Sequence, residues 1–480
     1  IDGNEADCRE FLLGGTLGAH MTVFGGGQLR LDRAVIADQA GTSARLVMDG
    51  ANSPLQLRHL TNSPVIVGQF GDGSIDLFDT QFIHSGALVL GSRAGSMGSL
   101  NLFGTSDLLM SAEVASNVFV GFAGSGFIGL EQEGILSGNG PISFRLGDRE
   151  TGDGEIRFNG LNDPQSFVSS LLEIGVLGQG RFRVLGGSVV QTTVTSAAVL
   201  GAGRDSIGEI DVLNVSRLII DGVALEVGRG GLGIVSIGEG SLLETPDTTV
   251  AYVDGVIQGS GDLAGDLRLI GGEIRPNDTF AETGAVQRLL VDGKIVFNGI
   301  NPFTNDFETG RLVYTLRSGN PASSITVQAT STATIDGTLR VIVPQGVRPK
   351  IGEKYTVLDA ASLTGTFDAV QTEILEDAAI AVPLYDPGDG KVSVEFFDFD
   401  VPQSVLQFSQ TASPPGDLVD GVLEDVTGDG LPDLIVIADE GAGQAGVIRV
   451  ARNLGVLPNG QWLGFDQKID IYSSLGDRPA

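Results

Sequence analysis

The feature that most constrains this chain is a short motif that recurs through its first 300 residues. Glycine opens each copy, and apolar residues occupy the third and fifth places. Seven copies are "GSIDLF" at 73, "GSLNLF" at 98, "GFIGLE" at 126, "GEIRFN" at 154, "GRFRVL" at 180, "GEIDVL" at 208 and "GIVSIG" at 233. The steps between their glycines are 25, 28, 28, 26, 28 and 25 residues. A nearly constant step of this size indicates one supersecondary unit per repeat.

Such a unit has room for two or three short strands and cannot bury its apolar side chains alone. Stacked coils can bury them, because each strand pairs in parallel with the coils above and below, about 4.8 Å away. A propeller is disfavoured, since its blades take about 40 to 50 residues each. We therefore predict an all-β fold, a right-handed parallel β-helix (solenoid). Its core should hold the pairs Ile75/Leu77, Leu100/Leu102, Ile128/Leu130, Ile156/Phe158, Phe182/Val184, Ile210/Val212 and Val235/Ile237.

Two further patterns extend this prediction. The motif is assigned three more copies at longer steps, "GQLRLD" at 27, "GDLRLI" at 265 and "GKIVFN" at 293. An apolar residue followed by glycine also precedes most copies, and this glycine is expected to turn the chain with a positive φ. These pairs are Leu90-Gly91, Val120-Gly121, Leu146-Gly147, Leu177-Gly178, Leu200-Gly201 and Val227-Gly228.

Three longer stretches resemble a known class of repeats. They are "VLGQGRFRVLGGSVVQTTVTSAAVLGAGRDSIGEIDV" (176–212), "GSGDLAGDLRLIGGEIRPND" (259–278) and "GTLRVIVPQGVRPKIGEKYTVLDAASLTGTFDAV" (337–370). Respectively, they resemble the β-helical repeats, the final coils and the closing segment of autotransporter passenger domains and related large secreted bacterial proteins. The resemblance implies a solenoid over residues 1–300 and a β-rich capping segment over residues 301–400.

The stretch "EDVTGDGLPDLIVI" (424–437) is the strongest indication of a metal site. Oxygen ligands at alternate places with glycine at the sixth suit a hard cation such as Ca²⁺. An EF-hand would need glutamate at the twelfth place, where this loop has Val436. The loop resembles instead the calcium loops of FG-GAP and VCBS repeats, which lie between strands. That resemblance implies a Ca²⁺-binding module over residues 401–480, with ligands from Asp425, Thr427, Asp429, Leu431 (through its carbonyl) and Asp433.

The alternative for this loop is an acidic turn without an ion. Residues 411–440 hold eight carboxylates and no lysine or arginine, so a loop without a cation would repel itself. We expect Ca²⁺ to have a structural role, because an ion that binds only the folded state stabilises that state. We also expect the module to continue beyond residue 480 or to pair with a neighbouring chain.

The charge balance excludes some partners. The formal net charge is −31, which argues against nucleic-acid backbones and anionic membrane surfaces. No apolar run is long enough to span a bilayer. The acidity fits a secreted, extracellular or cell-surface protein exposed to calcium.

Other candidate sites have simpler explanations. His59 and His84 are one repeat apart and could stack on adjacent coils, but a solvent-facing or hydrogen-bonded histidine is the simpler interpretation of each. The acids of "GDRETGDGE" (147–155) could hold a cation between coils or cluster by chance. The glycines of "GGG" (25–27) lack the strand and helix that a phosphate loop needs.

Three functions remain. The first is an extracellular structural or adhesive surface protein, a rigid rod or a fibre or matrix subunit that contacts other copies or surface glycans. The second is a polysaccharide lyase or hydrolase, although its sugar platforms usually need tryptophan and tyrosine. The only tryptophan is Trp462, and no tyrosine precedes Tyr252. The third is a binding module for a carbohydrate or a protein.

Overall fold

The structure is a computed structural model. It describes residues 5–51, 55–110, 116–138, 142–276, 288–316, 326–374, 379–398, 418–424, 433–438, 446–451 and 469–475. The regular elements of these residues are all strands. The chain divides into two compact units, residues 1–375 with 383–395, and residues 376–382 with 396–480.

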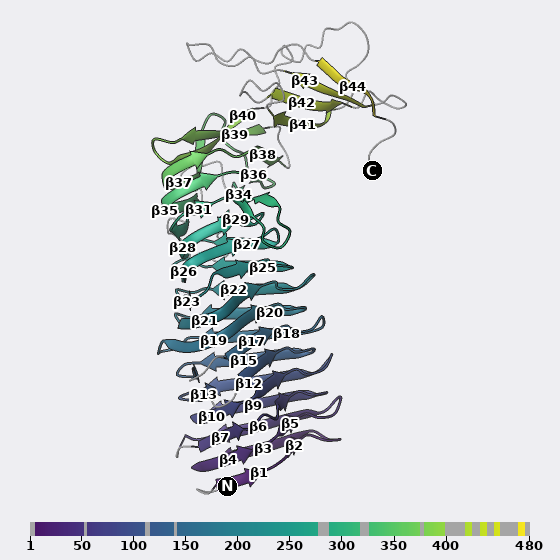
Figure 1. Cartoon of the computed structure of the whole chain (residues 1–480), viewed down its shortest axis with the longest axis vertical. Coiled ribbons are helices and arrows are strands. Elements are labelled where there is room, and N and C mark those ends of the chain that lie inside the picture. Colours follow the sequence, from purple (N-terminus) through teal and green to yellow (C-terminus); the bar gives the residue numbers. More distant parts are fainter. Residues whose placement is uncertain are drawn as a thin grey trace. The chain divides into compact units, whose positions relative to one another are not determined.

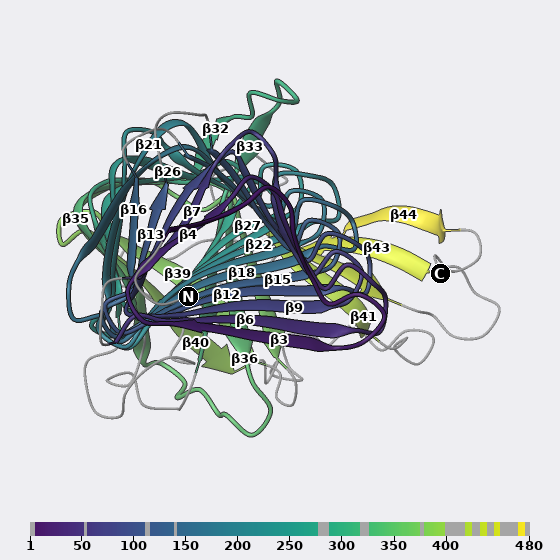
Figure 2. The ribbon, with the colours of Figure 1, turned by 90° about the horizontal axis from the view of Figure 1, so that it is seen from below.

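The first unit is a parallel β-solenoid, as the repeat predicts (Figure 1). Its first coils each give one strand to each of three sheets, called A, B and C in chain order, and the sheets enclose a triangular cross-section (Figure 2). Sheet A has six strands: β1 (Glu5–Cys8), β4 (Gly27–Leu31), β7 (Leu55–Leu60), β10 (Thr80–Ser85), β13 (Asp107–Met110) and β16 (Ile135–Gly138).

Sheet B follows sheet A in each coil. Its parallel strands are β2 (Phe11–Leu13), β5 (Ala34–Ile36), β8 (Val65–Val67), β11 (Ala87–Leu90), β14 (Ser116–Val120), β17 (Ile142–Leu146), β19 (Gln165–Ile174), β21 (Val189–Leu200), β23 (Arg217–Asp221), β24 (Leu225–Val227), β26 (Leu242–Ala251), β28 (Asp262–Leu269), β30 (Arg288–Asp292), β31 (Ile295–Val296), β35 (Thr326–Ile335) and β37 (Lys354–Gly365). From β19 onward several of these strands are long, because one strand then replaces the separate A and B strands of a coil.

Sheet C closes each coil and has 14 strands. They are β3 (Ala19–Phe24), β6 (Ser43–Asp49), β9 (Asp72–Phe78), β12 (Met97–Phe103), β15 (Ser125–Glu131), β18 (Asp153–Asn159), β20 (Gln179–Leu185), β22 (Ile207–Val212), β25 (Leu232–Ile237), β27 (Gly255–Gly259), β29 (Glu273–Pro276), β34 (Arg311–Thr315), β36 (Thr338–Val343) and β38 (Ala369–Ile374).

The predicted core pairs lie in sheet C and stack in register. Ile75 is opposite Leu100, and Leu100 is opposite Ile128. All seven predicted pairs are buried, each side chain being 0–1% exposed. The same column continues through Ile257 and Ile274. Burying aliphatic side chains in one continuous column is the main stabilisation of the stack.

Two columns of glycine explain why the motif begins with this residue. Gly154 opens the motif in β18, and a Cβ there would lie 1.9 Å from the carbonyl oxygen of Val120 and 2.8 Å from the nitrogen of Gly147. Gly147 itself turns the chain from sheet B to sheet C with a φ of +64°. The motif glycines are aligned in consecutive strands: Gly73, Gly98, Gly126, Gly154, Gly180, Gly208, Gly233 and Gly255. We call the turns from sheet B to sheet C the glycine edge.

The turns from sheet C to the next coil use serine instead. The backbone N–H of Thr80 donates to the Ser106 hydroxyl at 3.2 Å, and that of Leu161 donates to Ser188 at 3.1 Å. A third N–H, that of Ser216, donates to Ser241 at 3.2 Å. These three serine side chains are fully buried. We call these turns the serine edge.

Four assignments from the sequence are wrong in phase. Gly27 opens β4 in sheet A, and Gly265 lies within β28 in sheet B. Gly293 lies between β30 and β31, also in sheet B. The turning glycine before Gly180 is Gly175, with a φ of +70°, and not Gly178. The three motif errors have one cause: alternating apolar residues after a glycine occur in strands of every sheet, so the motif alone does not identify the sheet. The fourth error arises because Gly175 and Gly178 both follow an apolar residue, so that pattern alone does not identify the turning glycine.

The parallel pairing continues past residue 300. β34, β36 and β38 extend sheet C, and β35 and β37 extend sheet B. The pairing then changes, because β40 (Lys391–Asp398) runs antiparallel to β37; β39 (Ala379–Asp386) precedes it. A short antiparallel hairpin, β32 (Asn298–Ile300) and β33 (Phe307–Thr309), also projects from the glycine edge. That the closing segment acts as a cap stays a prediction.

The second unit contains four antiparallel strands in chain order. They are β41 (Leu418–Glu424), β42 (Asp433–Ala438), β43 (Gly446–Ala451) and β44 (Ile469–Leu475).

Candidate functional site

The predicted calcium loop connects two neighbouring strands. β41 ends at Glu424 and β42 begins at Asp433, and these two residues are directly opposite each other in the antiparallel pair. The two residues that flank the predicted loop are therefore adjacent in the sheet. Of the five predicted ligands, Asp425, Thr427, Asp429 and Leu431 lie outside the described residues, and Asp433 is described in its backbone only. The ligand set remains a prediction.

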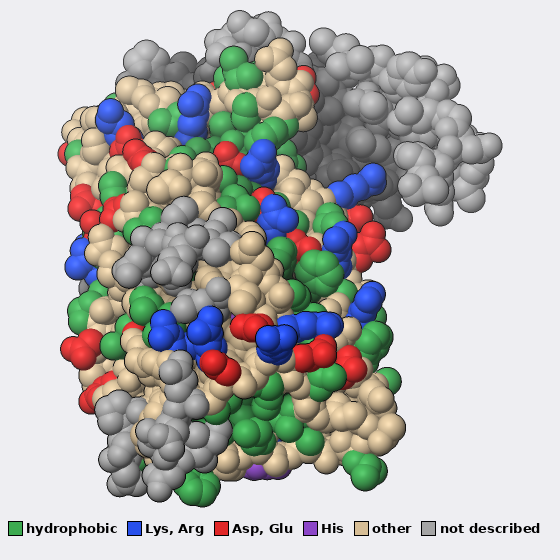
Figure 3. Space-filling view, turned by 60° about the horizontal axis from the view of Figure 1, so that its bottom comes forward, with side chains coloured by type: hydrophobic (Ala, Val, Ile, Leu, Met, Phe, Trp, Pro, Cys, Tyr) green, Lys and Arg blue, Asp and Glu red, His purple; other side chains and the backbone are tan. Residues whose placement is uncertain are grey.

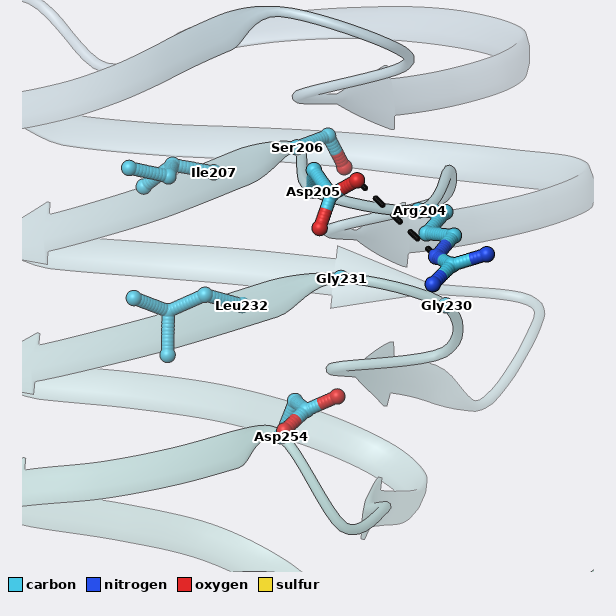
Figure 4. Close-up of a pocket in the computed structure, with 8 residues that line it drawn as sticks. All are labelled: Arg204, Asp205, Ser206, Ile207, Gly230, Gly231, Leu232 and Asp254. Carbon is cyan, nitrogen blue, oxygen red and sulfur yellow. Dashed lines mark ion pairs between the residues drawn. The ribbon is translucent and has the colours of Figure 1, made fainter.

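A hollow lies on the glycine edge. Its volume is about 460 Å³. It spans three coils and is lined by Arg204, Asp205, Ser206, Ile207, Gly230, Gly231, Leu232 and Asp254 (Figure 4). Arg204 and Asp205 form a loose ion pair at 3.9 Å with side chains 94% and 92% exposed. The hollow is therefore open to solvent, with charged groups at its rim and Ile207 beside Leu232 at its apolar end.

Sequence reasoning missed this hollow because its turns were interpreted only as corners. One available signal was the length of the turns. From the turning glycine to the motif glycine, the spacing alternates strictly between five and seven residues, from Gly68–Gly73 through Gly91–Gly98 to Gly228–Gly233. Taking Gly178 instead of Gly175 as the turning glycine conceals this alternation. Neighbouring turns of unequal length leave a recess between them.

Arginines and acids bridge adjacent coils on the outer face of sheet C. Arg181 contacts Glu209 at 3.0 Å and Asp153 at 3.4 Å. On the same strand, Arg183 contacts Asp211 at 3.0 Å and Glu155 at 3.8 Å. On the face shown in Figure 3, positive and negative side chains are interspersed and do not gather by sign. Such pairs add modest stability to the stack.

These contacts explain the acidic stretch at 147–155. Asp153 and Glu155 face arginines of the next coil, and Asp148 lies 3.7 Å from Arg145 and 3.5 Å from Arg149. Burial raises the pKa of Asp148, and the two arginines lower it in part. Among the residues described, no three metal-ligating side chains converge, here or elsewhere. The stretch is therefore an ion-paired surface rather than a cation site.

His59 and His84 stack on adjacent coils, as their spacing allowed. Their ring centroids are 5.0 Å apart, and both side chains are fully buried. Nδ1 of His59 lies 3.0 Å from the carbonyl oxygen of Ser85 and Nε2 lies 3.2 Å from that of Asp32, and the neutral ring can donate to one of these two oxygens. Neither ring nitrogen of His84 has a hydrogen-bond partner among the described residues.

Burial sets the protonation of this pair. It lowers the pKa of His84 to about 3, with a smaller contribution from repulsion by His59, while the Gly86 backbone acts in the opposite direction. Burial also lowers the pKa of His59, against its hydrogen bonds to Ser85 and Asp32. His84 is therefore a neutral core residue at physiological pH, with no ligand geometry around it.

Comparison with known proteins yields no relative from which a site could be transferred. No protein-family model matches the chain, and no curated protein is significantly similar to it. Within the described residues, no helix has the length and apolar character needed to cross a bilayer.

Proposed function

We propose that this chain is an extracellular structural or adhesive protein in which the solenoid is a rigid rod. The observation that carries the proposal is the unbroken parallel register of sheet C, from β3 to β38. Backbone hydrogen bonds, a shared aliphatic column and glycines in close contact with the neighbouring backbone hold each coil to the next. Bending therefore requires breaking many contacts at once.

The outer face supports the same function. Its arginines and acids are committed to pairs between coils, as in Arg181 with Glu209 and Arg183 with Asp211. Such pairs stiffen the stack without forming a concentrated binding site. A strongly acidic net charge also keeps extended molecules from associating without specificity.

The location and the rod are tested together. Antibody labelling and protease treatment of intact native cells should reach the protein, and negative-stain images of the purified full chain should show straight particles. Strictly intracellular protein, or particles that bend freely along the solenoid, would contradict the proposal.

Residues 401–480 are proposed to carry a structural Ca²⁺. Asp425, Asp429 and Asp433 would supply carboxylates, Leu431 its carbonyl, and Thr427 its hydroxyl or a bound water. The pair of strands β41 and β42 fits this role, because Glu424 and Asp433 are opposite each other and so bring the two ends of the loop together. When bound, the cation would neutralise the carboxylates and link the two strands.

Removal of calcium tests this assignment. A chelator should lower the melting temperature of a transition in the native chain, and excess Ca²⁺ should restore it. Asp429→Asn should abolish this response, whereas Asp211→Asn, on sheet C, should leave it intact. An unchanged transition after chelation means that the loop is an acidic turn.

The alternative function is a polysaccharide-binding or polysaccharide-degrading β-helix protein. The hollow at Arg204, Asp205 and Asp254 is the observation in its favour, because an open recess with charged groups can accept a polymer. A glycan array and a reducing-end release assay on the native chain distinguish binding from cleavage. If the native chain releases reducing ends and Asp205→Asn abolishes this release, polysaccharide cleavage replaces the rod as the proposed function.

A further inference from the structure

Exposed apolar side chains gather on one edge of the solenoid. We count with the glycine edge the first residues of the sheet C strands and the β32–β33 hairpin. Nine of the fifteen exposed large apolar residues in the described part of the chain lie there: Leu17, Phe70, Met97, Leu177, Leu232, Val253, Ile300, Phe303 and Phe307. Single exposed apolar residues are ordinary, but their concentration along one edge marks an interaction surface.

Arginines alternate with these apolar residues from coil to coil. Along six consecutive turns the side chains are Phe70, Arg93, Phe122, Arg149, Leu177 and Arg204. The guanidinium of Arg93 lies 5.6 Å from the ring centroid of Phe70, and that of Arg149 lies 5.0 Å from that of Phe122. Long turns with arginine therefore fold over short turns with an apolar residue in two successive pairs of coils. The alternation ends after Arg204, because the next short turn, Gly228–Gly233, carries Arg229.

Between residues 68 and 233 the edge is almost neutral on a strongly acidic chain. Its turns and strand starts in this stretch carry four arginines and five acids: Arg93, Arg149, Arg204 and Arg229, with Asp72, Asp148, Glu150, Asp153 and Asp205. No lysine precedes Lys294. Aromatic residues, methionine and arginine are enriched at protein interfaces, where lysine and glutamate are depleted. The composition of this edge therefore favours a protein partner.

We propose that the glycine edge is a lateral contact surface for a second copy of this chain. The proposal deepens the structural function above and rests on it. Since apolar and arginine turns alternate, a second copy shifted by one coil, about 4.8 Å, places arginines of one rod against apolar turns of the other. Elsewhere two copies with a net charge of −31 repel each other, so this edge is where they can approach.

A polyanion fits the edge less well than a second copy does. Asp205 lies beside Arg204, and both Asp148 and Glu150 flank Arg149, so an anionic polymer would meet carboxylates next to two of the four arginines. A second copy shifted by one coil instead places apolar turns opposite these charged turns. The two partners also differ in their dependence on salt.

Sedimentation velocity of the full chain over a concentration series tests the contact. The native chain should self-associate, more strongly at about 0.15 M than at about 0.01 M ionic strength, because salt screens the repulsion between acidic rods. Leu177→Glu and Arg204→Glu should each weaken association at least tenfold. Val168→Glu is the matched control, since Val168 lies in the same coil as Leu177 but in β19, with 38% exposure against 40%. It should associate like the native chain.

Three outcomes overturn the inference. The first is a native chain that stays monomeric at all concentrations. The second is an equal loss of association in Leu177→Glu and Val168→Glu. The third is a monomeric chain that binds soluble polygalacturonate through Leu177 and Arg204, with an affinity that falls as the salt concentration rises. Circular dichroism and thermal unfolding establish that each variant is folded. Straight particles on the cell surface that do not associate would leave the rod function standing and remove only this contact.

Discussion

The glycine edge and the serine edge solve the same problem, how to turn the chain between sheets, by different physical means. At the glycine edge the backbones of adjacent coils touch, and a Cβ at Gly154 would lie 1.9 Å from a carbonyl oxygen. At the serine edge, buried hydroxyls such as that of Ser188 accept hydrogen bonds from backbone N–H groups. Close approaches to the backbone occur there too, at Gly50 and Gly261, but a particular side chain also takes part in the turn.

This difference decides how each edge tolerates change. A close approach between backbones cannot relax locally, because the two strands are held in register by the whole sheet. A hydrogen bond to a serine can be lost at the cost of one buried N–H group. The two edges should therefore differ in mutational sensitivity.

The largest effect is expected at the glycine column. Gly154→Ala forces a Cβ into the carbonyl of Val120 and should lower the free energy of unfolding by roughly 4 kcal/mol or more, an exceptional value for one methyl group. Denaturant unfolding of the full chain measures the change. Gly15→Ala is the control at the same edge, since a Cβ there meets no atom within 4 Å, and it should be neutral. Similar results for both would mean that the close approach to Val120 does not determine the effect.

The next effect concerns the buried histidines, which lie away from both edges. His84 has a pKa of about 3 in the folded state and about 6.5 in the unfolded chain, so the folded state binds fewer protons between these values. Its contribution is fully present above pH 6.5 and is lost as the pH falls toward 3, at about 1.4 kcal/mol per pH unit.

Unfolding of the native chain and of His84→Leu over this pH range isolates that contribution from the titration of the many carboxylates. The difference in unfolding free energy between the two proteins should change steadily with pH. His20→Leu, at an exposed position, should show the native pH dependence. Parallel curves for His84→Leu and the native chain would show that His84 accepts a proton in the folded state.

A smaller effect is expected at the serine edge. Ser188→Ala leaves the Leu161 N–H buried without its acceptor and should lower the unfolding free energy by about 1 to 2 kcal/mol. Ser43→Ala, on the exposed side of β6, should change it by less than about 0.5 kcal/mol. A loss at Ser188 as large as that at Gly154 would mean that both edges are equally rigid.

The smallest effect belongs to the ion pairs on the faces between the edges. Arg183→Gln removes contacts to Asp211 and Glu155 from a side chain that is 30% exposed, and should cost less than about 1 kcal/mol. The cost should shrink further at high salt. Arg204→Gln, whose ion pair is almost fully exposed, should leave stability unchanged. A loss of several kcal/mol at Arg183 would make these pairs more than a surface feature.

The sequence predicted the glycine edge better than any other part of the molecule. Only glycine fits where Gly98, Gly126 and Gly154 meet the neighbouring backbone, so the residue recurs from Gly73 onward, whereas Ala19 and Ala44 take the aligned position in the first two coils. Serine is common in many contexts, and the role of Ser188 at the opposite edge was therefore not visible in the sequence. The phase of Gly27 and Gly265 was wrong for a related reason, since a period of two residues is the same in all three sheets.

The candidate sites show the same contrast between what the sequence predicted and what only the structure revealed. The spacing of His59 and His84 indicated that they could stack, yet only the coordinates place both rings in the core, where desolvation keeps them neutral. For the acids at 147–155 the sequence left open a cation site or a chance cluster, and only the structure shows their arginine partners from other coils. The contacts that neutralise a charge come from residues distant in sequence, so local spacing does not reveal them.

The sequence alone determined the stacking, because a glycine and two apolar residues in each turn leave a parallel column as the arrangement that buries them. The tertiary structure decided which strand belongs to which sheet, which charges meet, and that one edge collects the exposed apolar side chains. These properties depend on turn lengths and on the alignment of coils. They arise only when some 27 residues of chain bring one rung above the next.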